Sequence, residues 1–378
     1  MCKVAAMIRL MGVLVTVGVF TNCANLESFS DEDCMNCELW NGDNRIEASQ
    51  IRNEVLRNIA DVTGLILYMD PNSLGEETVS LSHGKTLREI VERDDRLFCE
   101  DVRFVDQRLL EAPSCGGVLL TPNLLATAAH CIQYNVVIEN DEVVSCENIQ
   151  VGFGYELSAD GSMPSELPRN DVYTCKSVEI WDPQSPTSDI YADFALIRLD
   201  RDVDGFKSED ISLTFQRPPN GTNISTLGFP MNLPMKLSSG ETVEKHFTEK
   251  FLELFQGTSL ENDQLIRNHE NYFSDLVHNK AEVFKGNSGG PMMVNSSGVL
   301  LGNVSTAGMV SFRDFYPNGQ PYWSPSSEIE LILDNEQQCI KVVDCTDDDV
   351  ICKNHGGAVV YADYKEQLEA LGIVGIDL

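Results

Sequence analysis

The sequence predicts an all-β fold, a barrel or a sandwich of many short strands. Short apolar runs recur along the chain, and several of them are rich in β-branched residues. Pro, Asn or Gly bounds these runs, as is typical of strands joined by tight turns. No internal repeat and no low-complexity tract is visible. The predicted strands lie within residues 60–69, 116–130, 148–155, 194–199, 224–229 and 298–308.

Two segments are the main helical candidates. KTLREIVER, residues 85–93, precedes the first motif discussed below, and YADYKEQLEALGI, residues 361–373, has apolar residues at helical spacing. A polar, proline-bearing segment at residues 206–223 is typical of a connection between two halves. We therefore predict an N-terminal half over residues 44–215 and a C-terminal half over residues 216–378.

The composition indicates a folded and strongly acidic protein. The chain has 378 residues, of which 42% are hydrophobic, enough for one large domain or two packed halves. Its 59 acidic and 27 basic residues give a formal net charge of -32. Such a surface repels nucleic acid and anionic membranes, so neither is an expected partner.

The first residues predict a signal peptide over residues 1–24. Lys3 and Arg9 make its start positive, and Leu10 to Phe20 form an apolar run of 11 residues. That run is too short to cross a bilayer comfortably and has the length of a signal-peptide core. We expect a secreted, periplasmic or cell-envelope protein.

An acidic segment over residues 25–43 follows and is a candidate propeptide. Cys23 offers an alternative, a lipid anchor. Asn22 precedes it where a lipoprotein signal normally has a small residue, which argues against lipidation. No membrane contact is expected beyond anchoring during export.

The cysteines support export, because an even number behind a signal-like start favours disulfides. Cys34 and Cys37 have the CxxC spacing of a redox motif or half a zinc site, but no second CxxC and no paired histidines accompany them. The ten cysteines after residue 24 are Cys34, Cys37, Cys99, Cys115, Cys131, Cys146, Cys175, Cys339, Cys345 and Cys352.

Three motifs carry side chains suited to nucleophilic catalysis. His130 ends a strand-like run in LLATAAHCI, and Asp193 opens the buried-strand pattern DFALIRL. Ser288 lies in KGNSGGPM, where small neighbours let a nucleophile expose its oxygen on a tight turn. The backbone N–H groups of Gly286 and Ser288 can then face a developing oxyanion. Taken singly, each residue also has a structural explanation: a buried histidine, a solvated strand end or a turn serine.

The order His, Asp, Ser matches the chymotrypsin arrangement and differs from the subtilisin and α/β-hydrolase orders. Pro291 follows GNSGG at once, where a hydrolase elbow would continue into a helix. The blocks SCGGVLLTPNLLATAAHC, YADFALIRL and KGNSGGPM resemble the signature blocks of trypsin-like serine proteases. More narrowly, the chain is similar to bacterial secreted trypsin-like and V8-like peptidases over roughly residues 40–375, as in WNGDNRIEA, FCEDVRFVDQ and LGFPMNLPMKLSSG.

This resemblance implies two six-stranded β-barrels packed face to face, a C-terminal helix and an active site between the barrels. It implies His130 as general base, Asp193 as the carboxylate that orients it, and Ser288 as the nucleophile that forms an acyl-enzyme. Gly286 and Ser288 would form the oxyanion hole, and Ser305 would support the aspartate and border the substrate strand. Protein or peptide substrates, no cofactor, no metal and a monomer are expected.

Two positions bear on activation and specificity. Asn287 stands where animal trypsins carry the aspartate that binds a new N-terminal amine, so that salt-bridge switch is not expected. Glu282 lies six residues before Ser288, where trypsins place the acidic base of the S1 pocket, and would favour Lys or Arg at the cleaved bond. Glu282 pointing to solvent is an equal alternative, because the cysteine that braces this loop in trypsins is Phe284 here. Val304 disfavours specificity for glutamate.

The disulfide prediction is strongest for Cys115 and Cys131, which bracket the histidine loop. Among Cys339, Cys345 and Cys352 we expect one local pair, with the third cysteine joined to Cys99 or another upstream residue.

The sequence is also compatible with two other functions and contains several weaker motifs. One alternative is a catalytically silent homologue that binds protein ligands, against which the intact triad and Gly286 argue. An HtrA-like protease-chaperone is disfavoured because only about 70 residues follow Ser305.

Two acidic motifs have the composition of calcium sites. DRDVDG resembles the start of a calcium-binding loop, but Ile211 occupies position twelve and cannot supply the carboxylate needed there. The motif CTDDD near 345–349 is typical of a solvated surface loop. Sequons occur at Asn220, Asn223, Asn295 and Asn303.

Overall fold

A computed structural model of the chain describes the greater part of residues 44–378, and the statements below concern that part. The described residues are 44–71, 74–91, 97–99, 102–112, 114–139, 142–183, 193–243, 276–279, 281, 283, 286–306, 314–315, 321–322, 331–334, 339–342 and 356–378. The predicted signal peptide, the acidic segment 25–43, the CxxC pair and the 345–349 cluster lie outside them.

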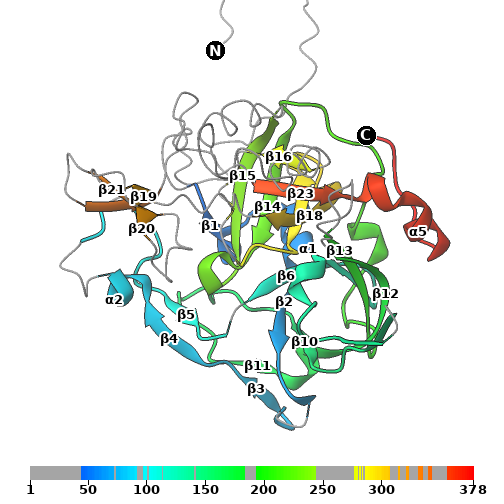
Figure 1. Ribbon diagram of the computed structural model, residues 1–378, viewed down its shortest axis with the longest axis horizontal. Helices are drawn as coiled ribbons and strands as arrows, with labels where there is room; N and C mark the ends of the chain where they lie inside the picture. Colours follow the sequence, from blue (N-terminus) through cyan, green and yellow to red (C-terminus); the bar gives the residue numbers. More distant parts are fainter. Residues whose placement is uncertain are drawn as a thin grey trace, which may run out of the picture.

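The first barrel is a closed ring of six antiparallel strands, drawn in blue to green in the lower right of Figure 1. The ring runs β10–β12–β13–β7–β6–β2 and back to β10. Its strands are β2 (Thr63–Tyr68), β6 (Cys115–Thr121), β7 (Leu124–Thr127), β10 (Ile149–Gly152), β12 (Val172–Asp182) and β13 (Phe194–Leu199).

The second barrel also closes through six strands, because β16 pairs with both β23 and β15. The ring runs β15–β14–β17–β18–β23–β16, and β1 (Ile46–Glu47) adds to it along β15. Its strands are β14 (Asn223–Gly228), β15 (Lys236–Val243), β16 (Val277–Asn279), β17 (Pro291–Val294), β18 (Leu300–Thr306) and β23 (Gly356–Val360). The predicted all-β fold with two six-stranded barrels is confirmed.

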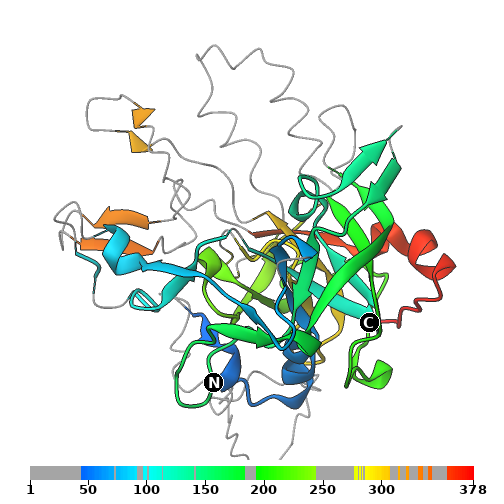
Figure 2. The same cartoon turned by 90° about the horizontal axis from the view of Figure 1, so that it is seen from below.

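In the described residues, five two-stranded sheets of short strands lie outside the two barrels (Figures 1 and 2). The paired short strands are β3 (Thr78–Ser80) with β11 (Glu166–Pro168), β4 (His83–Thr86) with β5 (Arg108–Leu110), β8 (Val137–Glu139) with β9 (Glu142–Ser145), β19 (Asp314–Phe315) with β20 (Pro321–Tyr322), and β21 (Leu331–Asp334) with β22 (Cys339–Val342).

The helices differ from the sequence prediction in detail. Helix α1 (Glu54–Asp61) was not predicted; Asn53 caps it by accepting bonds from the N–H groups of Val55 and Leu56. The candidate at 85–93 is the shorter α2 (Leu87–Val91), because the residues before it pair as β4.

The candidate at 361–373 is divided between two elements. A 3-10 turn η8 (Tyr361–Tyr364) leads into α5 (Lys365–Ala370), which ends before Gly372 at φ 82°. None of the helices in the described residues combines the length and hydropathy needed to cross a bilayer.

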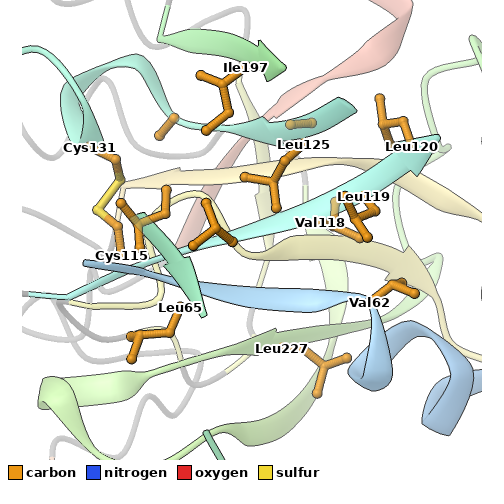
Figure 3. Close-up of a cluster of buried hydrophobic side chains, with 14 of the residues drawn as sticks. Val62, Leu65, Cys115, Val118, Leu119, Leu120, Leu125, Cys131, Ile197 and Leu227 are labelled. Atoms are coloured by element: carbon orange, nitrogen blue, oxygen red, sulfur yellow. A yellow bond between two sulfur atoms is a disulfide. The ribbon is translucent and has the colours of Figure 1, made fainter. Parts of the chain in front are cut away.

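A continuous core connects the two barrels. Leu65, Val118, Leu125 and Ile197 of the first barrel and Leu227 of the second barrel belong to one buried cluster (Figure 3). All five are fully buried. Because the cluster contains residues of both barrels, the packing that stabilises the fold also fixes one barrel against the other.

The C-terminal segment is packed against the first barrel, beside β12 and β13 (Figures 1 and 2). The ring of Phe194 lies 4.4 Å from that of Tyr364 and 6.1 Å from that of Tyr361. The hydroxyl of Tyr364 also donates to Asp182 at 2.9 Å. Phe194 directly follows Asp193, so the C-terminal segment buttresses the start of the strand that carries this carboxylate.

A buried ion pair fastens β1 to β15. Lys236 Nζ lies 2.9 Å from Glu47 Oε2, donates to the carbonyl of Pro234 at 2.8 Å and stands 4.9 Å from the centre of the Phe104 ring. The side chain of Lys236 is 1% exposed. Burying an ammonium is tolerated only with such partners.

Glu47→Gln is therefore expected to lower the free energy of unfolding by about 3 kcal/mol, because it leaves the Lys236 charge buried without its carboxylate. The double variant Glu47→Gln/Lys236→Met should recover much of that loss. Urea unfolding of both variants and the wild type measures the difference. A double variant no more stable than the single one would contradict the assignment of the loss to the stranded Lys236 charge.

Candidate active site

His130 stands on a tight turn at the end of β7. The turn, η4 (Ala129–Cys131), is fixed by the disulfide between Cys131 and Cys115 of β6. The hydroxyl of Tyr68 on β2 donates to the carbonyl of Cys131. The His130 side chain remains 31% exposed, so its ring is accessible while its backbone is held by two neighbouring strands.

Asp193 is fully buried at the start of β13, and every bond it makes points toward the candidate site. Its Oδ2 lies 2.8 Å from His130 Nδ1 and also accepts from the hydroxyl of Ser305 on β18. Its Oδ1 accepts from the backbone N–H of His130 at 2.9 Å. A buried carboxylate with three donors is satisfied as an anion and holds the imidazole in a single orientation.

Ser288 lies on a turn whose geometry demands glycines. Gly286 has φ 97° and Gly289 has φ 79°, both in the left-handed region. A Cβ on Gly289 would stand 2.1 Å from the carbonyl oxygen of Gly116 and 2.2 Å from Thr127 Oγ1. The glycines are thus required by the backbone and by close contact with the first barrel.

The serine turn is bonded to both barrels. The carbonyl of Ser288 accepts from the N–H of Gly116 on β6 at 2.7 Å. The N–H of Gly289 donates to Val304 on β18 at 2.6 Å. Among the backbone bonds of the described residues, neither the N–H of Gly286 nor that of Ser288 is used as a donor.

Ser288 and His130 share no hydrogen bond among the described residues. His130 Nε2 has the Cys131 sulfur 3.8 Å away instead. Serine–histidine hydrogen bonds are often long without substrate and tighten in the complex. The structure therefore brings the aspartate, the histidine and the supporting Ser305 into direct contact and places the serine on a neighbouring turn.

Asn287 is buried at 3% exposure and packs against Gly228 of β14. A Cβ on Gly228 would stand 2.8 Å from Asn287 Oδ1. Within the part of the chain that is described, this oxygen has no hydrogen-bond partner. A neutral amide tolerates such a position better than an aspartate, whose charge would need a buried cation.

The potential metal ligands near the site already take part in a disulfide or in hydrogen bonds. Cys115, His130 and Cys131 lie within 4.8 Å of one another, but both sulfurs are joined in the disulfide and cannot bind metal as thiolates. In the DRDVDG turn, Asp200 accepts from the N–H of Thr174 and Asp202 accepts from an asparagine. The carboxylates of Asp200 and Asp202 thus accept hydrogen bonds from different residues.

Glu282, predicted for the base of the S1 pocket, lies outside the described residues, as does Phe284, so the basic-residue preference stays a prediction. Val304, on which the expectation against glutamate specificity rests, is described and fully buried. Sequence reasoning missed Tyr68 and Asn303, which carry no motif signal because their partners are distant in sequence.

The structure describes three disulfides. They are Cys115–Cys131, Cys99–Cys339 and Cys146–Cys175. The second links the segment after α2 to β22 and agrees with the expectation that one of the three late cysteines joins Cys99. The expected local pair among those cysteines falls on Cys345 and Cys352, which lie outside the described residues.

Burial raises the pKa of Tyr68 from its ordinary value of 10.0 to about 12. A raised pKa in the folded state means that the neutral phenol stabilises the fold. This contribution is fully present below about pH 10 and is lost as the pH rises to about 12.

Tyr68→Phe should therefore cost about 1 kcal/mol at neutral pH, through the lost bond to Cys131, and should flatten the fall in stability between about pH 10 and 12. Urea unfolding at a series of pH values measures this slope. Tyr134→Phe removes a tyrosine that is 87% exposed and serves as the control. Equal slopes in the Tyr68 variant and the wild type would contradict the assignment.

Comparison with known proteins agrees with this geometry. The family model described as Trypsin matches residues 103–322, more than half of the chain. Kallikrein 1-related peptidase b11 of Mus musculus is 28% identical over 197 residues, covering 50% of this chain and 67% of its own. Trypsin beta of Drosophila erecta is 27% identical over 201 residues, covering 51% and 68%.

A solved structure of Rv3671c from M. tuberculosis H37Rv covers 86% of this chain and 94% of its own. It has 11% sequence identity and a TM-score of 0.38, a likeness too low to support a conclusion about function. The narrower resemblance to V8-like peptidases stays a prediction. The family match together with the two barrels shows that the chain belongs to the trypsin family of chymotrypsin-fold serine proteases.

Proposed function

We propose that the protein is a serine endopeptidase that hydrolyses peptide bonds through His130, Asp193 and Ser288. Ser288 attacks the scissile carbonyl, and its proton passes to His130 Nε2 as the acyl-enzyme forms. His130 then gives this proton to the leaving amine. Water hydrolyses the ester in the second half of the reaction, with the histidine again acting as base.

The observation that carries this proposal is the set of bonds to Asp193. The carboxylate is fully buried, yet it accepts from the Nδ1–H and the backbone N–H of His130 and from the hydroxyl of Ser305. With Nδ1 acting as donor, Nε2 is left as the acceptor that a general base needs. The same bonds favour the imidazolium that forms in the transition state.

The oxyanion would bind at the serine turn. The N–H groups of Gly286 and Ser288 are the proposed donors, and the positive φ of Gly286 sets the direction of the first of them. Ser305, on β18, would also border the substrate strand. Family membership supports protein or peptide substrates, and the proposed reaction uses no cofactor.

We further propose export to an oxidising compartment. Three disulfides in the described residues support it, because such bonds persist outside the cytosol. The signal-like residues 1–24 point the same way.

Labelling with a fluorophosphonate probe tests the activity, with mass spectrometry to locate the adduct. We expect one adduct, on Ser288, because only an activated serine beside an oxyanion hole reacts at an appreciable rate. Folded, disulfide-bonded protein without an adduct would contradict the proposal and favour the alternative, a silent homologue that binds protein ligands.

A further inference from the structure

We propose that Asn303 is a positioning residue, which holds the serine turn in register with the histidine strand across the boundary between the barrels. The inference rests on the proposed function, because it concerns the geometry of the same site. It adds a side chain that does not touch the reacting atoms and acts through the backbone of its neighbours.

The amide of Asn303 bridges two elements that carry catalytic side chains. Its Nδ2 donates to the carbonyl of Ala126 on β7 at 3.2 Å and to the carbonyl of Gly289 at 2.5 Å. Ala126 lies four residues before His130, and Gly289 directly follows Ser288. A single NH₂ group therefore fixes the distance between the two segments.

The strand that carries Asn303 contacts all three parts of the triad. Val304 accepts from the N–H of Gly289 at 2.6 Å and donates to the carbonyl of Gly290 at 2.8 Å. Ser305 donates to Asp193. Residues 303–305 of β18 thus make three hydrogen bonds to the serine turn, one to the histidine strand and one to the buried aspartate.

Stability alone does not explain an amide at this position. Asn303 is 1% exposed, and its Oδ1 is buried without a hydrogen-bond partner in the described part of the chain. An orphaned buried acceptor costs free energy, and an apolar side chain of the same size avoids that cost. The two donated bonds are what an apolar residue cannot supply.

Glycosylation does not explain it either. Asn303 lies in an Asn-Val-Ser sequon, but its side chain is buried in β18 and its NH₂ is bonded to two carbonyls. The nitrogen that would take a glycan is inaccessible in the folded protein. This leaves the bridge between Ala126 and Gly289 as its function.

Asn303→Leu removes both donated bonds together with the orphaned oxygen and keeps the branching of the side chain at Cγ. The carbonyl of Gly289 loses its partner and the serine turn is free to shift relative to His130. A displacement of about 1 Å lowers a rate by about 100-fold, so we expect kcat and the rate of fluorophosphonate labelling to fall about 10- to 100-fold. KM for a peptide that the wild type cleaves should change less than about 2-fold.

Ser225→Ala is the matched control. Ser225 is a fully buried polar residue of the same barrel, bonded to Ser239 and Asn295 at 3.0 and 2.9 Å. Its loss should lower the melting temperature without changing kcat. If Asn303 were purely structural, its variants would also lower the melting temperature without changing kcat. A fall in kcat therefore distinguishes a positioning role from a structural one.

Asn303→Asp provides a second variant of the same shape, in which a carboxylate without N–H donors faces the two carbonyls. Its labelling rate should fall at least as far as that of Asn303→Leu. Labelling of either folded variant at the wild-type rate would overturn the inference while leaving the proposed function intact. Failure of both variants to fold also counts against it, because it would mark a structural residue. Absence of labelling in the wild type would instead refute the proposed function.

Discussion

Ser288→Ala is expected to lower kcat by about 10⁶-fold, to the level that binding and the oxyanion hole supply without a nucleophile. The hydroxyl is the group that forms the acyl-enzyme, and no neighbouring side chain of the turn replaces it. The turn itself should be unaffected, because its backbone bonds to Gly116 and Val304 do not involve the hydroxyl. Peptide binding should therefore persist.

The measurement is hydrolysis of a fluorescent peptide by purified, disulfide-bonded protein, with the labelling experiment in parallel. Ser296→Ala is the control, since Ser296 is exposed on the turn between β17 and β18. It should retain full activity. Proteolysis by the Ser288 variant at a rate near that of the wild type would show that the activity comes from a different site or a contaminating protease.

Asp193→Asn is expected to lower kcat by about 10⁴-fold with little change in fold. The carboxylate accepts from His130 Nδ1, whereas an amide can place an NH₂ there and stabilise the opposite tautomer, in which Nε2 carries the proton. The histidine then cannot accept the proton of Ser288. The imidazolium that forms during catalysis also loses its counter-ion.

Single-turnover kinetics on the Asp193→Asn variant measures this loss. Asp204→Asn, at an exposed acidic residue of the same barrel, is the matched control and should leave kcat unchanged. The double variant Asp193→Asn/Ser288→Ala should be no slower than Ser288→Ala alone, because the residues act as a unit. A loss of less than about 10-fold for Asp193→Asn would contradict the assigned role.

The architecture was predictable because the apolar runs and motifs that indicate it lie in short, continuous segments of the sequence. The run at 194–199 is β13, and the run at 224–229 contains most of β14. The three motif blocks also lie in short segments whose residue types reflect local needs: glycines at positive φ, small residues beside the histidine, and a carboxylate at a strand end.

Local sequence patterns did not predict the elements whose structure depends on pairing with distant strands. The 11-residue strand β12 was not predicted, since its partly exposed sequence VYTCKSVEIWD lacks a clean apolar run and is held by pairing with β10 and β13. Helix α2 is shorter than predicted because β4 pairs with β5, a choice that depends on residues about 25 positions away.

By itself, the sequence determined the fold class, the family and the identity of the candidate catalytic residues. The bond from Ser305 to Asp193 was expected only through the family resemblance. The tertiary structure alone decided which groups fasten these residues together: Tyr68 on the histidine turn, Gly116 on the serine turn and Asn303 between them. These bonds join residues far apart in the chain, so no local pattern encodes them, and they exist only once both barrels have closed.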